Sequence, residues 1–141
     1  MQEVNFDFEL DKILAKDPRF SREAYVFVRE ALDFTQKIIG RENQGNVRHV
    51  NGQELLDGIR QLALQQFGPM AVTVFEEWGI TKCPDFGDIV FNMVESSVLS
   101  KTEKDTRHDF QNGYDFNDAF RKPFWPASKS QPETKKAAKL N

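Results

Sequence analysis

Apolar residues recur along most of this chain at intervals of three and four, which is the spacing of one buried helix face. The pattern predicts five helices, at about 6–15, 21–39, 51–67, 69–78 and 84–96. Proline and glycine mark several of their ends: Pro18 follows the first helix, Gly40 the second, Gly68 the third and Gly79 the fourth. The sequence therefore predicts a mainly α-helical domain.

The third predicted helix has the clearest start. Asn51 is followed three residues later by Glu54, the spacing of a capping box in which each side chain accepts a hydrogen bond from the other residue's backbone. The apolar stripes of this helix and the next one include Phe67 and Phe75, and we expect both rings to be buried.

The pattern changes after Leu99. Asn112 and Gly113 form a dipeptide that is typical of a hairpin turn but also fits the end of a helix, and both interpretations stay open. Three helices followed by a hairpin make a winged helix-turn-helix domain, so we expect a winged-helix-like core over 51–116 with one small β-hairpin after residue 98. The alternative is an irregular helical bundle with a C-terminal aromatic patch.

Length and composition narrow the class of protein. The chain has 141 residues, enough for one domain, and its thirteen Phe residues supply ample aromatic area for a core. Cys83 is the only cysteine, so no internal disulfide forms. No apolar run is long enough to span a membrane, and the N-terminal residues do not resemble a signal peptide. We expect a cytoplasmic protein with no membrane association.

Charge is distributed unevenly. Residues 123–141 contain four lysines and one glutamate, a net charge of +3, so the net charge of −3 for the chain leaves −6 on the preceding 122 residues. From about residue 127 the sequence has too few apolar side chains to offset the entropy of ordering. We therefore predict one helical domain over 1–122 and a basic, disordered tail over 123–141.

Three segments, 48–80, 85–110 and 114–120, carry a family resemblance. They begin RHVNGQELLDG, DFGDIVFNMVE and YDFNDAF, and the similarity extends from about Phe20 to Phe120. The chain resembles an uncharacterised protein family restricted to Verrucomicrobia and Planctomycetes, with Ser96-Ser97 where an Ala-Gly pair would be typical. The resemblance implies a single domain from a bacterial cytoplasm and no assigned activity.

No catalytic, cofactor-binding or metal-binding residue stands out, so the sequence does not indicate an enzyme. Asp105, His108 and Asp109 lie close in sequence, but such a group more often forms a solvated polar surface than a metal site. Cys83 precedes Pro84 and is expected to cap the fifth helix, where a lowered thiol pKa is conceivable but a structural role is favoured.

Two surfaces are candidates for binding a partner protein. The outer face of the fifth predicted helix would present an acidic set that disfavours nucleic acid and suits a basic partner: Asp85, Asp88, Asn92 and Glu95. Phe124 and Trp125, flanked by prolines, become docking anchors if they stay exposed. Arg48 and His49 either close their loop against Glu54 or Asp57 or take part in binding.

The sequence thus favours a non-catalytic protein-interaction or regulatory module. One alternative is a nucleic-acid or ribosome-associated factor that uses the basic tail. A second alternative is an enzyme whose site is formed by residues distant in sequence.

Overall fold

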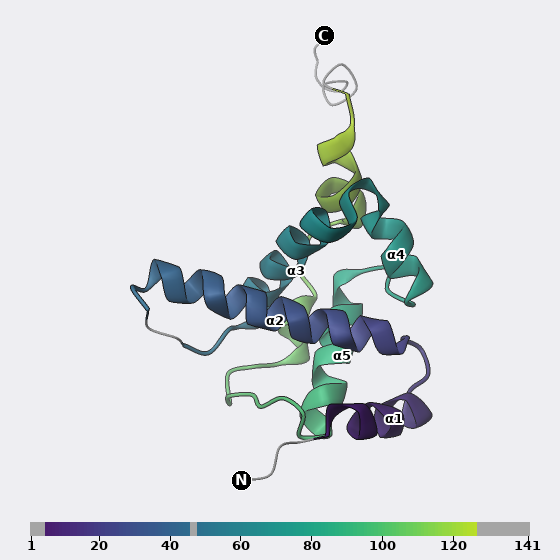
Figure 1. The fold of residues 1–141 in the computed structure, drawn as a ribbon, viewed down its shortest axis with the longest axis vertical. Helices are drawn as coiled ribbons and strands as arrows, with labels where there is room; N and C mark the ends of the chain where they lie inside the picture. The colour runs from purple at the N-terminus through teal and green to yellow at the C-terminus, as the bar shows by residue number, and fades with distance from the viewer. Residues whose placement is uncertain (1–4, 46–47, 127–141) are drawn as a thin grey trace.

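The computed structural model describes residues 5–45 and 48–126, which form a mainly helical domain (Figure 1). Five α-helices follow one another: α1 (Phe6–Lys16), α2 (Arg22–Glu42), α3 (Gly52–Phe67), α4 (Ala71–Glu77) and α5 (Cys83–Glu95). Four short turns join or follow them: η1 (Gly68–Met70), η2 (Arg107–Phe110), η3 (Asn117–Arg121) and η4 (Lys122–Phe124). The prediction of a mainly helical domain is confirmed. Of the tail predicted over 123–141, residues 127–141 lie outside the described residues, whereas Pro123 and Phe124 belong to η4.

Two local signals fix helix ends as predicted. The Oδ1 atom of Asn51 accepts a hydrogen bond from the Glu54 N–H at 2.9 Å, and the Glu54 carboxylate accepts one from the Asn51 N–H at 3.0 Å. Gly79 ends α4 with φ at +90°, and a Cβ atom there would lie 2.2 Å from the carbonyl oxygen of Arg19. Glycine is therefore required at this position both by conformation and by space.

Two other predicted boundaries are wrong. α2 does not stop before Gly40 but continues through it to Glu42, and Gly40 is buried within the helix. The positive φ angles occur later, at Gln44 (57°) and Gly45 (93°), and the Gly45 N–H donates to the Gly40 carbonyl at 2.6 Å. The fourth helix starts late, since Pro69 belongs to the 3-10 turn η1 that precedes α4.

No β-strand occurs among residues 5–45 and 48–126, so the hairpin predicted after residue 98 is wrong, and the winged-helix form of 51–116 is not shown. Residues 111–116 instead carry their aromatic side chains into the core. The Tyr114 hydroxyl donates to the Leu56 carbonyl at 2.7 Å, and Phe116 is buried. Because these rings are buried in the core, residues 111–116 do not form the second strand of a hairpin.

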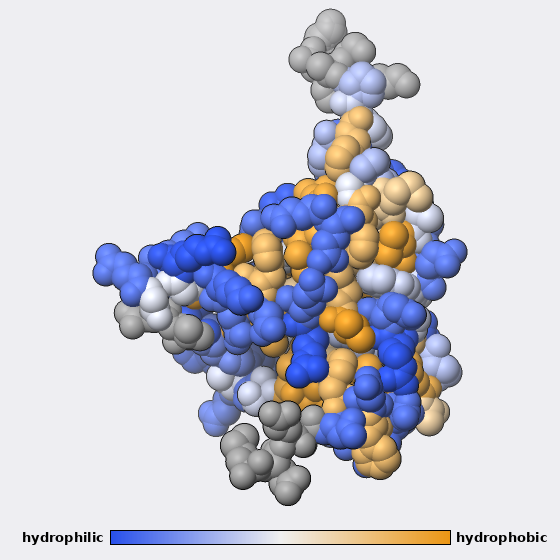
Figure 2. Space-filling model, viewed as in Figure 1, coloured by the Kyte–Doolittle hydropathy of each residue, from blue (hydrophilic) through white to orange (hydrophobic). Residues whose placement is uncertain are grey.

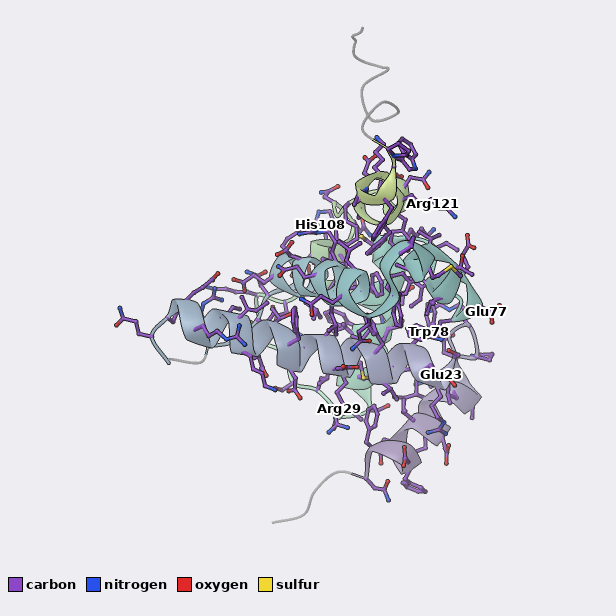
Figure 3. All side chains as sticks on the ribbon, turned by 45° about the horizontal axis from the view of Figure 1, so that its top comes forward. Glu23, Arg29, Glu77, Trp78, His108 and Arg121 are labelled. Carbon is purple, nitrogen blue, oxygen red and sulfur yellow. The ribbon has the colours of Figure 1, made fainter. Side chains whose placement is uncertain are left out.

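The core is organised around α4. Figure 1 shows α2 running across α3 and α5, and Figure 3 shows Trp78 between α4 and α2. Phe75 is fully buried, and its ring centroid lies 5.3–6.2 Å from six other aromatic rings, those of Phe27, Phe67, Trp78, Phe86, Phe116 and Phe120. This aromatic cluster joins α2, α3, α4, α5 and the C-terminal turns.

α2 and α3 approach each other closely at one point. A Cβ atom on Gly58 would lie 1.7 Å from the Thr35 hydroxyl oxygen, which donates to the Ala31 carbonyl at 2.7 Å. The missing side chain at Gly58 thus lets the two helices meet. Within the described part of the chain, no helix combines the length and apolar character needed to cross a membrane.

Candidate binding site

A cavity of about 270 Å³ lies between α2, the start of α3, the C-terminal half of α5 and the segment 98–110. Its walls are mostly apolar. Six of the lining side chains are only half-buried, so they leave apolar surface accessible: Leu32, Val90, Phe91, Val94, Val98 and Leu99. A cavity with apolar walls and a few polar groups is the usual form of a small-molecule site.

His49 and Asp105 lie among the residues that line this cavity. The His49 Nε2 atom lies 2.5 Å from Asp105 Oδ2, and the same oxygen accepts hydrogen bonds from the N–H of Thr102 at 2.9 Å and its hydroxyl at 3.2 Å. Burial alone would raise the pKa of Asp105, but the hydrogen bonds from Thr102 and His49 outweigh burial and lower it. The pair therefore ties the segment after α5 to the residues that precede α3.

Arg48, the neighbour of His49, has a structural contact. Its Nη1 atom donates to Glu54 Oε1 at 2.9 Å, and Nη2 also pairs with Oε2. The hydrogen bond from Arg48 lowers the pKa of Glu54, so both groups are charged at neutral pH. The expectation that this loop closes against Glu54 is confirmed.

Cys83 is not positioned as a nucleophile. α5 begins one residue earlier than predicted, with Lys82 as its cap, so Cys83 is the first helical residue and the predicted cap position is wrong. The thiol is buried and lies 3.4 Å from the Tyr114 carbonyl oxygen. Burial raises the pKa of Cys83 to about 11, so the thiol stays protonated at neutral pH.

Titratable side chains do not gather into a metal-binding group within the described ranges 5–45 and 48–126. Asp105, His108 and Asp109, which are close in sequence, point to different partners. Asp105 pairs with His49, and Asp109 accepts a hydrogen bond from the Thr106 N–H at 3.1 Å. His108 is exposed on η2 (Figure 3).

The acidic face of α5 differs from the prediction, because two of its four residues are used to hold the fold. Asp85 is only 8% exposed, since its carboxylate accepts hydrogen bonds from the N–H groups of Thr81 and Lys82. The Asn92 side chain donates to Asp17 at 2.9 Å and to the Tyr25 hydroxyl at 3.0 Å. The Asp85 carboxylate and the Asn92 amide nitrogen are thus engaged in contacts within the molecule.

The other two acidic residues of this face are paired with arginines. Asp88 lies between Arg19, at 3.1 Å, and Arg107, at 2.7 Å. Arg107 also lies 3.5 Å from Glu95, whose side chain remains 57% exposed. Arg19 and Arg107 therefore offset part of the negative charge of the α5 face.

The sequence predicts that Phe124 and Trp125 are docking anchors if they stay exposed. They meet this condition, since they are 45% and 43% exposed. They lie at the end of the C-terminal turns, which project from the body of the domain (Figure 1). Figure 2 shows apolar residues continuing from the body onto this projecting segment. The Lys122 ammonium lies 5.9 Å from the Trp125 ring centroid.

Comparison with protein-family models, with curated proteins and with solved structures finds no match to this chain. The family resemblance described from the sequence therefore stays a prediction.

Proposed function

We propose that this protein is a non-catalytic adaptor or regulatory module that binds another protein, with Phe124 and Trp125 as its apolar anchors. The observation that carries the proposal is the exposure of two adjacent aromatic side chains on a projecting turn. Large aromatic residues are the most frequent energetic anchors of protein interfaces, and exposing them without a partner is unfavourable.

Charge around the aromatic pair favours an apolar groove with an acidic rim as the partner surface. Arg121 and Lys122 are exposed beside the pair, although Lys122 also pairs with Asp118 (Figure 3 labels Arg121). A second contact could form between the α5 face and a basic group of the partner. Glu95 is the best placed residue of that face, because its side chain is the most exposed of the four. Charges at the rim of an interface mainly steer association.

The experiment compares proteins captured from the native cells by three forms of the full chain. The wild type, the double variant Phe124→Ser with Trp125→Ser, and the control Phe8→Ser are used as baits. Phe8 is 55% exposed on α1, so the control removes a similar aromatic surface elsewhere. We expect the double variant alone to lose a specific companion, with a dissociation constant raised about thirtyfold or more in a purified assay, as for interface anchors.

The alternative function is association with nucleic acid or ribosomes through the basic tail, which the charge of residues 123–141 supports. Truncation after Ala127 distinguishes the two functions. The nucleic-acid function is supported, and the adaptor proposal contradicted, if truncation abolishes salt-sensitive RNA or DNA binding while the Phe124 and Trp125 variant still binds the same RNA or DNA. A winged-helix relationship for 51–116 and a cytoplasmic location stay predictions.

A further inference from the structure

The apolar cavity and the polar groups beside it have no part in the adaptor proposal. We propose that this cavity binds a small amphiphilic carboxylate, with a short aliphatic or single-ring tail against the apolar walls and the carboxylate beside Lys101. The proposal is independent of the adaptor function, because the cavity and the aromatic pair involve different residues.

Size and wall chemistry define the tail. A volume of about 270 Å³ lies just below the range of ordinary ligand pockets, so the ligand must be small. α5 contributes Val90, Phe91 and Val94 from one side, and Val98 and Leu99 come from the segment that follows it. Such walls stabilise an apolar tail by removing its surface from water.

Charge defines the head group. Both carboxylates at the cavity already have donors: Asp105 accepts from His49 and Thr102, and Asp109 accepts from Thr106. The Lys101 ammonium has only a 3.4 Å contact with the Thr102 carbonyl, and no carboxylate of the described residues lies within 4.0 Å of it. A lysine beside an apolar cavity can lay its stem on the wall while its charge meets an anion.

His49 adds a second polar group. Its Nε2 atom is held by Asp105, which orients the ring, while Nδ1 has no hydrogen-bond partner among the residues that the structure describes. Because Nε2 donates to Asp105, Nδ1 of a neutral imidazole has no proton and accepts hydrogen bonds, so it is not the partner of the carboxylate. Lys101 therefore supplies the positive charge for the head group, and the oriented His49 ring forms a polar part of the same cavity wall.

The test titrates the full chain with octanoate and follows backbone amide signals by two-dimensional NMR. Octylammonium and 1-octanol serve as probes with the same tail and a different head. We expect octanoate to shift the signals of cavity residues such as Val94 and Leu99, with a dissociation constant in the millimolar range or below. Octylammonium should bind about three- to fivefold more weakly, the ratio expected for one partly exposed ion pair.

Two matched substitutions locate the site. Val94→Phe adds a ring to the cavity wall, whereas Val74→Phe adds the same ring at another half-buried position, on α4 and away from the cavity. We expect the first to abolish octanoate binding and the second to leave it unchanged, with circular dichroism checking that both remain folded. Lys101→Gln, a substitution of an exposed side chain, should weaken octanoate about threefold and leave 1-octanol unaffected.

Several results would overturn the proposal. Absence of octanoate-induced shifts up to about 10 mM, a concentration at which even weak ligands bind, excludes the site. Equal binding by Val94→Phe and the wild type places the ligand elsewhere. Tighter binding of octylammonium than of octanoate shows that the head group has been assigned wrongly. If Val94→Phe does not fold, competition between octanoate and 1-octanol for the same shifted signals in the wild type decides the location.

Discussion

Among single residues, Phe75 makes the largest contribution to the core. Its ring is fully buried and meets aromatic rings from α2, α3 and α5, from Trp78 at the end of α4, and from the C-terminal turns. We expect Phe75→Ala to lower the free energy of unfolding by about 3–5 kcal/mol, because the cavity left behind cannot collapse. Phe67 was expected to be equally buried but is half-buried, so Phe67→Ala should cost less. Urea melts of both variants measure the difference, and an equal cost would contradict this ranking.

Substitution of Asn51 measures the contribution of the N-terminal cap of α3. Its side chain accepts one of the free N–H groups at the start of α3, and Asn51→Ala removes this acceptor. We expect a loss of about 1 kcal/mol in the free energy of unfolding, which is typical for such a cap. Asn43→Ala, at the exposed end of α2, is the control and should change stability by less than about 0.5 kcal/mol. Equal effects for the two variants would show that the cap contributes nothing specific.

At the scale of elements, Asp88 connects three parts of the chain. From α5 it meets Arg19, in the turn between α1 and α2, and Arg107, at the start of η2. Each partly exposed ion pair contributes little alone, and together we expect about 1 kcal/mol for Asp88→Asn. The control is Asp57→Asn, which removes a single pair with Arg60 inside α3 and should cost less.

Reversal of the charge at Asp88 has a larger effect. Asp88→Lys places three cations together, so we expect it to be less stable than Asp88→Asn in thermal melts. From the sequence, Asp88 is expected on an exposed helix face where charge reversal would leave folding intact, but Arg19 and Arg107 both pair with it. A reversal variant as stable as the wild type would show that both arginines simply turn away into water.

Signals within a few residues of each other made the helices predictable. The capping box at Asn51 and the glycine at Gly79 predict their helix ends correctly because the residues involved are close in sequence. The segment after α5 was not predictable. Its conformation depends on burial of Tyr114 and Phe116 against distant helices, which outweighs the local preference of Asn112 and Gly113 for a hairpin.

The candidate site could not be predicted as a whole. His49 was singled out, but its partner Asp105 lies 56 residues away, and no local spacing links them. The sequence gives only weak evidence for the cavity walls. Phe91 lies beside the apolar stripe of α5, and Val98 and Leu99 are apolar residues that follow the end of that helix. Exposed Phe124 and Trp125, by contrast, could be proposed from their proline neighbours.

At the scale of the whole molecule, acid should unfold the domain by protonating carboxylates that join distant segments. Asp17, hydrogen-bonded to Arg19 and to Asn92 of α5, has a pKa well below its ordinary value of 3.8 because of the Arg19 hydrogen bond. The pKa values of Glu54 and Asp105 are also lowered. A lowered folded-state pKa stabilises the fold above the unfolded pKa, and this stability is lost as pH falls.

We therefore expect the free energy of unfolding to decrease between about pH 5 and about pH 2. Asp17→Asn should be less stable than the wild type at about pH 6, and its stability should change less over this range, because one of the groups that takes up a proton on unfolding is gone. Urea melts at several pH values measure both slopes. Parallel slopes for the two proteins would show that Asp17 does not contribute.

Cys83 can report local opening of the C-terminal segment. Its sulfur is covered by residues 113–114, since a Cβ atom on Gly113 would lie only 2.6 Å from it, and its pKa of about 11 keeps it unreactive. A thiol reagent can therefore reach this sulfur only when the C-terminal segment lifts from the start of α5. Where this local opening is more frequent than global unfolding, the rate of labelling in native buffer reports how often the segment detaches.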